Sequence, residues 1–438
     1  MRKKMMMGML IVLLGGSLLG CGQGENPDTT DPQGTLTPEA TNTPEVTQAI
    51  FQPVKKEEET KLTGLREQLE KVEGLEAEKW NALNGMSEHG GSHMFCVDGE
   101  TGVVYYVNYN KDFYIYRIKD GEVKLAVELP AKELYCKDGA VYFMIDTYEK
   151  YQLKEVADGD IYRYTSTTGV VELVYAAGAI ENSSEHTMRL DDSGIHFSYT
   201  ITETREENGS KRTARISHGR FLKFGSHEPV AESAFGTNDG WKNYAIGPVY
   251  TMESPVAPVF SLIDRTDLKE ISLEIERPCH YCVIGDTLYY LPGSNNTKVL
   301  AKELNTGETK EYDFWNAVKI QRSLNYNEEI SDEEFEKYVN DGKRLLTNFI
   351  IIGDFLYVTS GMNLYQMNLK TGKVCAYQAF DELRGVFGTL YTDGTNLYAM
   401  FATSSQSPKS LAKVYVDRVG VNEVGMATVE VEYVKETK

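Results

Sequence analysis

Apolar and polar residues alternate along two similar stretches of the chain, 284–312 and 352–377. In each, an apolar segment leads through a Gly/Asp turn into a Tyr-rich segment. A polar loop then leads into a third, alternating segment that ends at Gly307 or Gly372, and a fourth short segment closes the unit. A period of two is typical of strands, and glycine tolerates the positive φ of tight turns. Each stretch therefore predicts a four-stranded antiparallel sheet.

The same pattern recurs over most of the chain. It is clear over 99–129, 137–175 and 393–424, and the unit starts fall near Met94, Leu134, Met188, Tyr244, Tyr281, Phe349 and Leu390. Steps of about 40 residues match a propeller blade. One blade cannot bury its two apolar faces alone, whereas stacking in a circle buries both. We therefore expect an all-β chain with a single β-propeller over 90–434, of seven four-stranded blades, with six or eight left open.

One insertion interrupts the repeat at 316–348, between the fifth and sixth units. Ser331 followed by Glu334 predicts a helical capping box, and Phe335, Tyr338 and Val339 fall on one face of the predicted helix. The helix is expected to end by Gly342. The insertion is either a lid for a partner or ligand, or a surface decoration.

The first residues have the layout of a secretory signal peptide. Three positive charges at residues 2–4 precede an apolar run over 5–14, which is short for a membrane span. The following Leu-Leu-Gly-Cys, which ends at Cys21, resembles the lipobox of bacterial lipoproteins. The resemblance implies cleavage after residue 20, lipidation of Cys21 and a chain anchored to the bacterial membrane outside the cytoplasm. An ordinary signal peptide with a chance cysteine is the alternative.

Two segments separate the expected anchor from the propeller. Residues 21–59 are rich in Thr, Pro and Glu and poor in apolar residues, which predicts a disordered tether. The tether either spaces the domain from the membrane or has no spacing role. Residues 60–85 place Leu62, Leu65 and Leu69 at helical spacing, which predicts an amphipathic helix packed on the main domain or, less simply, a short coiled coil.

The stretch 361–377, GMNLYQMNLKTGKVCAY, resembles the repeat of quinoprotein-like (PQQ-repeat-like) β-propellers, and 302–312 resembles it less closely. The tryptophan that locks blades in that family is replaced here by Tyr312 and Tyr377. The resemblance covers roughly residues 90–430 and implies a fold, not an activity. We recognise no cofactor-binding set, so no cofactor is expected.

Composition narrows the class of partner. A formal net charge of −20 disfavours binding to the phosphate backbone of nucleic acids. The 28 tyrosines suit strands and could also stack on sugar rings, although an ordinary place in strands is the simpler interpretation.

The cysteines and histidines allow few sites. Cys96, Cys136 and Cys282 fall on the first strands of units, so we interpret them as small buried apolar side chains. The Cys279-His-Tyr-Cys282 motif has redox spacing, but it leads into a strand rather than a helix. His89 and His93 flank glycines, which disfavours a helical metal site. No metal site is predicted, and a redox pair or Cys/His site is the less favoured alternative.

No motif names a reaction, since the chain has neither a Walker loop nor a Gly-x-Ser-x-Gly elbow. The catalytic residues, if any, are therefore unknown. The sequence favours a non-catalytic binding or scaffold module at the cell envelope, with a protein or glycan partner on a propeller face. Two alternatives stay open: an extracellular enzyme acting on polysaccharide or peptide, and a sensory or envelope-assembly lipoprotein.

Overall fold

The computed structural model describes residues of one compact unit, Lys61–Lys438. The described residues are 93–437 without 147–155, 208–209, 233–239, 250–258, 266, 268, 277, 294–295, 342–344, 380–384, 404–407 and 422–425. The expected signal peptide (1–20), Cys21, the tether (21–59) and the helix (60–85) lie outside the described residues, so these expectations stay predictions.

Five four-stranded sheets follow one another along the chain, each a meander of consecutive antiparallel strands. Sheet 1 comprises β1 (Phe95–Val97), β2 (Val104–Val107), β3 (Ile115–Lys119) and β4 (Glu122–Val127). Sheet 2 comprises β5 (Ala131–Lys137), β6 (Ala140–Ile145), β7 (Ile161–Thr165) and β8 (Val170–Tyr175). Sheet 3 comprises β9 (Ser183–Leu190), β10 (Gly194–Glu207), β11 (Ser210–Lys223) and β12 (Val230–Glu232). Sheet 4 comprises β13 (Gly240–Trp241), β14 (Tyr244–Val249), β15 (Val259–Asp264) and β16 (Glu270–Glu276). Sheet 5 comprises β17 (His280–Ile284), β18 (Thr287–Leu291), β19 (Lys298–Glu303) and β20 (Thr309–Asp313).

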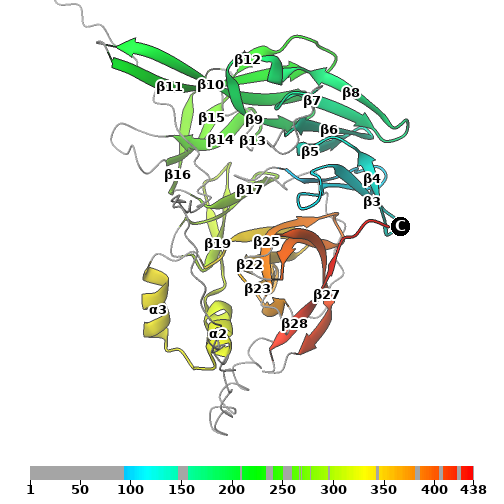
Figure 1. The fold of residues 1–438 in the computed structure, drawn as a ribbon. Helices are drawn as coiled ribbons and strands as arrows, with labels where there is room; N and C mark the ends of the chain where they lie inside the picture. The colour runs from blue at the N-terminus through cyan, green and yellow to red at the C-terminus, as the bar shows by residue number, and fades with distance from the viewer. Residues whose placement is uncertain are drawn as a thin grey trace, which may run out of the picture. The chain divides into compact units, whose positions relative to one another are not determined.

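The last eight strands form one sheet, in the order β21-β22-β23-β24-β28-β27-β26-β25. They are β21 (Asn348–Ile352), β22 (Phe355–Ser360), β23 (Asn363–Asn368), β24 (Val374–Ala379), β25 (Val386–Thr392), β26 (Leu397–Ala402), β27 (Ser410–Val421) and β28 (Ala427–Tyr433). The two halves are joined because β24 pairs with β28 in parallel, at Gln378 with Thr428 and Ala379 with Val429. The all-β, propeller-like arrangement agrees with expectation (Figure 1), but the prediction of seven separate blades does not.

Alternating side chains are buried on both faces of a sheet. On β23, Leu364 packs in the cluster shared with β25–β28, whereas its neighbour Tyr365 packs in the cluster shared with sheet 5. First strands contact one another, as β1 with β5 and β5 with β9, and so lie on the inner side. The first and last sheets also meet, where Phe95 stacks on Tyr391 at a ring separation of 5.0 Å. Burial of both faces is what the repeat predicts.

Two tyrosines occupy the places that the quinoprotein-like repeat gives to tryptophan. Tyr312 is buried in the cluster between sheet 5 and β21–β24, and Tyr377 is buried in the next cluster. The hydroxyl of Tyr377 donates to Gln366 Oε1 at 3.2 Å, and Gln366 Nε2 donates to Tyr357 at 3.1 Å. Tyr377 therefore fills apolar space while its hydroxyl keeps a hydrogen-bond partner.

The C-terminal residues attach to sheet 1. The Thr437 amide donates to the Val123 carbonyl at 2.8 Å, and the Val123 amide donates to Thr437 Oγ1 at 2.8 Å. Lys111 forms an ion pair with Glu436 at 2.9 Å. No described sheet combines strands from both ends of the chain, so side-chain packing and this C-terminal segment join the first and last sheets.

The insertion contains two helices, α2 (Trp315–Tyr326) and α3 (Asp332–Asn340). The capping box of Ser331 and Glu334 is present, and Phe335 and Val339 are buried against sheet 5 and β21–β24. In the described part of the chain, no helix is both long and apolar enough to span a bilayer.

Candidate functional site

The hairpin of β10 and β11 projects beyond its own sheet (Figure 1). The two strands pair with each other from Gly194–Lys223 to Glu207–Ser210. In contrast, β9 pairs only with residues 195–201 of β10, and β12 pairs only with residues 219–221 of β11. Residues 202–207 and 210–215 thus form a two-stranded ribbon whose described pairings are only with each other; we call it the arm. The Asn-Gly between its strands is a typical two-residue hairpin turn.

The arm has no core of its own. None of its described side chains, Thr202, Glu203, Thr204, Thr213, Ala214 and Arg215, is buried. A two-stranded ribbon is marginally stable by itself in water. Each strand also has one edge with no described ladder partner, and such edges are templates for pairing with another chain. In the described ladder, both edges of the arm are therefore open to a partner strand.

A bulge in β9 supports the base of the arm. The pairing of β9 with β10 shifts between Ser198 and Thr200, so two residues, Glu185 and His186, oppose one. Glu185 adopts a left-handed φ of 54°, and its carboxylate forms an ion pair with Arg215 on β11. Bulges commonly redirect a side chain, and here the extra residue carries the partner of an arm residue.

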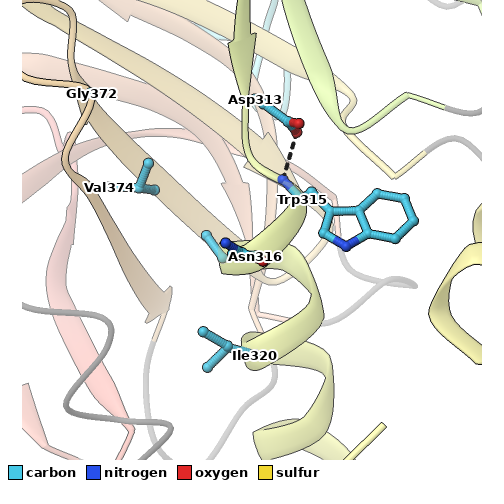
Figure 2. Close-up of a pocket in the computed structure, with 7 residues that line it drawn as sticks. Asp313, Trp315, Asn316, Ile320, Gly372 and Val374 are labelled. Carbon is cyan, nitrogen blue, oxygen red and sulfur yellow. Dashed lines mark hydrogen bonds between the residues drawn. The ribbon is translucent and has the colours of Figure 1, made fainter. Parts of the chain in front are cut away.

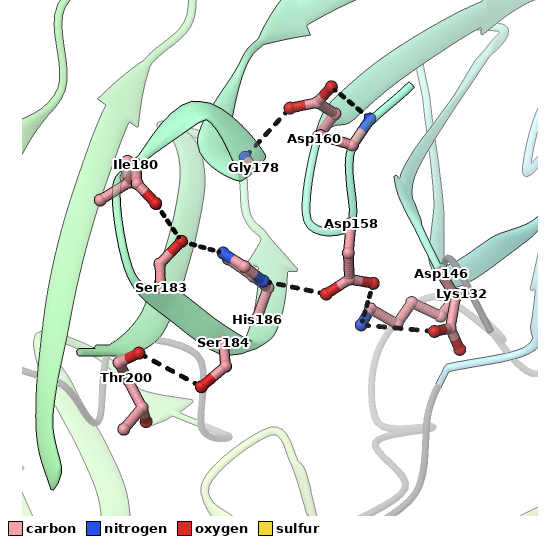
Figure 3. A network of polar contacts seen from close by, with 11 residues as sticks. Lys132, Asp146, Asp158, Asp160, Gly178, Ile180, Ser183, Ser184, His186 and Thr200 are labelled. Carbon is pink, nitrogen blue, oxygen red and sulfur yellow. Dashed lines mark hydrogen bonds and ion pairs between the residues drawn. The ribbon is translucent and has the colours of Figure 1, made fainter. Parts of the chain in front are cut away.

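His186, the other bulge residue, belongs to a polar network that joins sheets 2 and 3 (Figure 3). Its Nδ1 lies 3.1 Å from Asp158 Oδ2, and Lys132 lies 3.4 Å from Asp158 Oδ1. Lys132 also lies 3.8 Å from Asp146. Gly159, with a φ of 87°, lies against the imidazole, and a Cβ at that position would overlap the ring. The network holds the loop before β7 against the start of β9.

The network includes a Ser–His–Asp arrangement, because His186 Nε2 lies 3.0 Å from Ser183 Oγ. The Ser183 hydroxyl, however, donates to the Ile180 carbonyl at 2.7 Å. Nucleophilic catalysis requires the serine proton to point at the ring nitrogen, whereas here it points at a backbone carbonyl. The nearby amides of Gly178 and Ser183 donate to Asp160 and Ile180, so neither is available for an oxyanion. This geometry favours a holding role.

A second polar cluster joins sheet 3 to sheet 4. His196 on β10 lies 2.7 Å from Asp191 through Nε2 and 2.9 Å from Glu232 through Nδ1, and Arg265 lies 3.4 Å from Nδ1. Burial opposes the charged imidazole, but the hydrogen bonds to Asp191 and Glu232 prevail and raise the pKa of His196. Sheet 3, which carries the arm, is thus held by polar contacts on both sides.

A further pair of titratable groups lies where β1 and β5 begin, with Glu133 buried and His93 half-buried. Burial raises the pKa of Glu133, at a left-handed φ of 55°, to about 8, and desolvation with the Arg189 charge lowers the pKa of His93 to about 4. The His93 ring packs on Tyr135 at 4.9 Å, whereas His89 lies outside the described residues. Among the described residues, no three His, Cys, Asp or Glu side chains are placed to hold a metal ion.

A pocket of about 370 Å³ lies beside α2, where the insertion meets the β23–β24 turn. Asp313, Asn316, Ile320, Gly372 and Val374 are among its lining residues. Figure 2 shows the Trp315 indole pointing away from Gly372 and Val374, and the ring packs on Phe335 at 4.7 Å. The Asp313 carboxylate accepts from the Trp315 amide at 2.8 Å. Trp315 is also among the residues that line the pocket.

The cysteines lie largely where the sequence placed them. Cys96, Cys136 and Cys282 are buried, as expected of small apolar side chains, and Cys375, for which the sequence made no prediction, is buried too. Cys279 is partly exposed, with Sγ 3.5 Å from the Pro292 carbonyl. The residues of the polar network that joins sheets 2 and 3 were missed, because Lys132 and Asp158 of sheet 2 and His186 of sheet 3 are far apart in sequence and form no motif. Only the Asn-Gly turn signals the hairpin.

No protein-family model and no curated protein matches the chain. Solved structures do resemble it. Acylaminoacyl peptidase from Pyrococcus horikoshii is 13% identical over 77% of this chain and 52% of the peptidase, with a TM-score of 0.43. This chain thus spans about half the length of the peptidase. A chain of the mitotic checkpoint complex is 9% identical over 79% and 96% of the two chains, with a TM-score of 0.35.

The extracellular domain of a one-component system from B. thetaiotaomicron is also similar. It is 10% identical and has a TM-score of 0.28, and the match covers 81% of this chain and 35% of that one. At such identities and TM-scores these likenesses carry no argument about activity or ligand. The quinoprotein-like and lipoprotein assignments therefore stay predictions.

Proposed function

We propose that this chain is a non-catalytic binding module that is held on the outer side of a bacterial membrane by lipid on Cys21 and engages a protein partner through the arm. The observation that carries the proposal is the pairing of residues 202–207 and 210–215 with each other alone in the described ladder. A partner strand that adds to either edge would complete the ladder, which is a common mode of recognition.

The chemistry of the arm favours a protein over a glycan. Sugar binding commonly uses aromatic rings as platforms, and residues 202–215 contain no aromatic side chain. They contain four basic and three acidic residues, which suit polar contacts with a protein strand. The same charges protect an open edge against indiscriminate pairing.

The base of the arm favours a preformed site. The Glu185–Arg215 ion pair, the His186 network and the His196 cluster hold β9, β10 and β12 from two sides. A held base reduces the conformational entropy that is lost when the arm binds. The Ser183–His186 geometry supports holding rather than hydrolysis, which is why the enzyme alternative is not preferred.

Shortening the arm tests the proposal. Deletion of 204–207 and 210–213 leaves the Asn208-Gly209 turn between Glu203 and Ala214, which already face each other in the ladder. The full-length variant and the wild type are isolated from membranes with their bound proteins, which are identified by mass spectrometry. We expect the wild-type partner to fall about tenfold or more in the variant, as for loss of a binding hot spot.

The matched control is Thr213→Ser, which keeps the length and pairing of the arm. Thermal unfolding of all three chains shows whether the sheets persist. Equal recovery of partners by the shortened and intact arms would reject the arm as the binding site. A separate Cys21→Ala variant tests the anchor, because it should leave the membrane fraction while its arm still binds the partner.

A further inference from the structure

Two buried cysteines face each other across the junction of sheets 1 and 2. Cys96 lies on β1 and Cys136 on β5, and their Sγ atoms are 2.8 Å apart. Both side chains are at most 9% exposed. They belong to one apolar cluster with Tyr105, Leu134 and Val141. The two strands are the first strands of adjacent sheets and contact each other.

The short Sγ–Sγ distance between Cys96 and Cys136 favours a disulfide bond over two separate thiols. A thiol is a weak donor and a weak acceptor, so two thiols gain little by being held together in an apolar cluster. A disulfide places its sulfurs about 2.05 Å apart and removes both S–H groups. We infer that Cys96 and Cys136 form a disulfide that covalently links sheet 1 to sheet 2.

The inference rests on the proposed function in one respect, because structural disulfides persist in oxidising compartments outside the cytoplasm. The bond would close a loop of 40 residues in sequence separation. It would also tie the first described sheet to its neighbour, next to the backbone hydrogen bonds that Leu134 and Ala131 of β5 donate to the carbonyls of His93 and Phe113. Of the five cysteines after Cys21, the pairing uses two and leaves Cys279, Cys282 and Cys375.

The chemistry is thiol–disulfide exchange with a small disulfide or an oxidoreductase of that compartment. One cysteine thiolate attacks the oxidant disulfide and releases one thiol, and the second cysteine then displaces the other. The protein loses two electrons and two protons, and the oxidant becomes two thiols. Burial raises the pKa of Cys136, which disfavours the reactive thiolate in the folded chain. Exchange should therefore precede closure of the two sheets.

The first test is to refold the reduced full-length chain in detergent with oxidised and reduced glutathione, and in parallel with reduced glutathione alone. Remaining thiols are blocked with N-ethylmaleimide under denaturing conditions, and peptides are analysed without reduction. With oxidised glutathione we expect a Cys96–Cys136 cross-linked peptide, and we expect neither residue to carry N-ethylmaleimide. Maleimide on both residues, at the level found on Cys375, would overturn the inference.

A second measurement tests the Cys96–Cys136 pairing and the extracytoplasmic location separately. The free thiols of the protein are blocked with N-ethylmaleimide directly in cells, before lysis. A cross-link in cells supports both claims, whereas a cross-link only after refolding supports the pairing and contradicts an extracytoplasmic location. Reductant should lower the melting temperature of the wild type and of Cys375→Ser, but not that of the Cys96→Ser/Cys136→Ser double variant. An equal change in melting temperature of all three chains on adding reductant would contradict the disulfide between sheets 1 and 2.

Discussion

The junction of sheets 1 and 2 differs in kind from the junction of sheets 3 and 4. The first is an apolar cluster around Phe143 and Ile115, both fully buried. In the second, no apolar cluster of described residues spans both sheets, and His196 on sheet 3 meets Arg265 on sheet 4. Apolar burial is non-directional and insensitive to pH, whereas hydrogen-bonded charges are directional and depend on protonation.

The contrast indicates that different junctions between sheets are stabilised by different kinds of interaction. Where an apolar cluster joins two sheets, many side chains together fill the space between them, so no single atom has to take an exact position. Sheet 3 carries the arm, and its polar contacts to sheets 2 and 4 bring particular atoms together, His186 with Asp158 and His196 with Arg265. A sheet that must hold a projecting ribbon benefits from such directional contacts. Three measurements test this comparison.

The largest effect is expected from Phe143→Ala, which opens a cavity in the apolar junction. Loss of a fully buried phenylalanine should lower the free energy of unfolding by about 3–5 kcal/mol. Urea unfolding of the full-length chain measures it, and the loss should be the same at pH 6 and pH 8. Val171→Ala on the exposed strand β8 is the control, with an expected change below about 0.5 kcal/mol. A small loss for Phe143→Ala would show that this junction does not depend on apolar packing.

A smaller effect, which depends on pH, is expected from His196→Ala at the polar junction. Hydrogen bonds to charged groups contribute about 1.5–3 kcal/mol, so about 2 kcal/mol should be lost near pH 6. Because folding raises the pKa of His196, its contribution is full below the ordinary value of about 6.5 and is lost as the pH rises through the folded value.

Asp191, the carboxylate paired with His196 Nε2, sets the low-pH limit of this contribution to the free energy of unfolding. Hydrogen bonds from His196 and Ser193 outweigh burial and lower the pKa of Asp191, so its contribution is present above the ordinary value of about 3.9 and is lost as the pH falls through the folded value. The difference between wild type and His196→Ala should thus be largest between about pH 4 and 6.5 and shrink at higher pH. Urea unfolding across this range measures it, and a difference that is constant with pH would contradict the polar account.

The smallest effect is expected from Thr437→Val, which removes the acceptor for the Val123 amide and keeps the side-chain size. The contact is partly exposed, so the free energy of unfolding should fall by about 0.5 kcal/mol. Hydrogen exchange of the Val123 amide is the sharper readout, and it should accelerate. Lys435→Ala is the control on the same segment. Unchanged exchange at Val123 would show that the C-terminal segment does not hold sheet 1.

The sequence by itself determined the local structure, because alternation of side chains and glycine turns act within a few residues. The unit start near Phe349 falls in β21, Gly372 turns with a φ of 71°, and the capping box of Ser331 forms. Even the burial of Leu364 and Tyr365 on opposite faces follows from a period of two.

Only the tertiary structure decided which units touch, and through which atoms. The parallel pairing of β24 with β28 joined two predicted blades, although each half has the predicted meander. Lys132, Asp158 and His186 converge, and Cys96 meets Cys136, only because consecutive sheets stack face to face. A repeat specifies each sheet through near neighbours in the chain, whereas contacts between sheets depend on how the stacking aligns residues tens of positions apart.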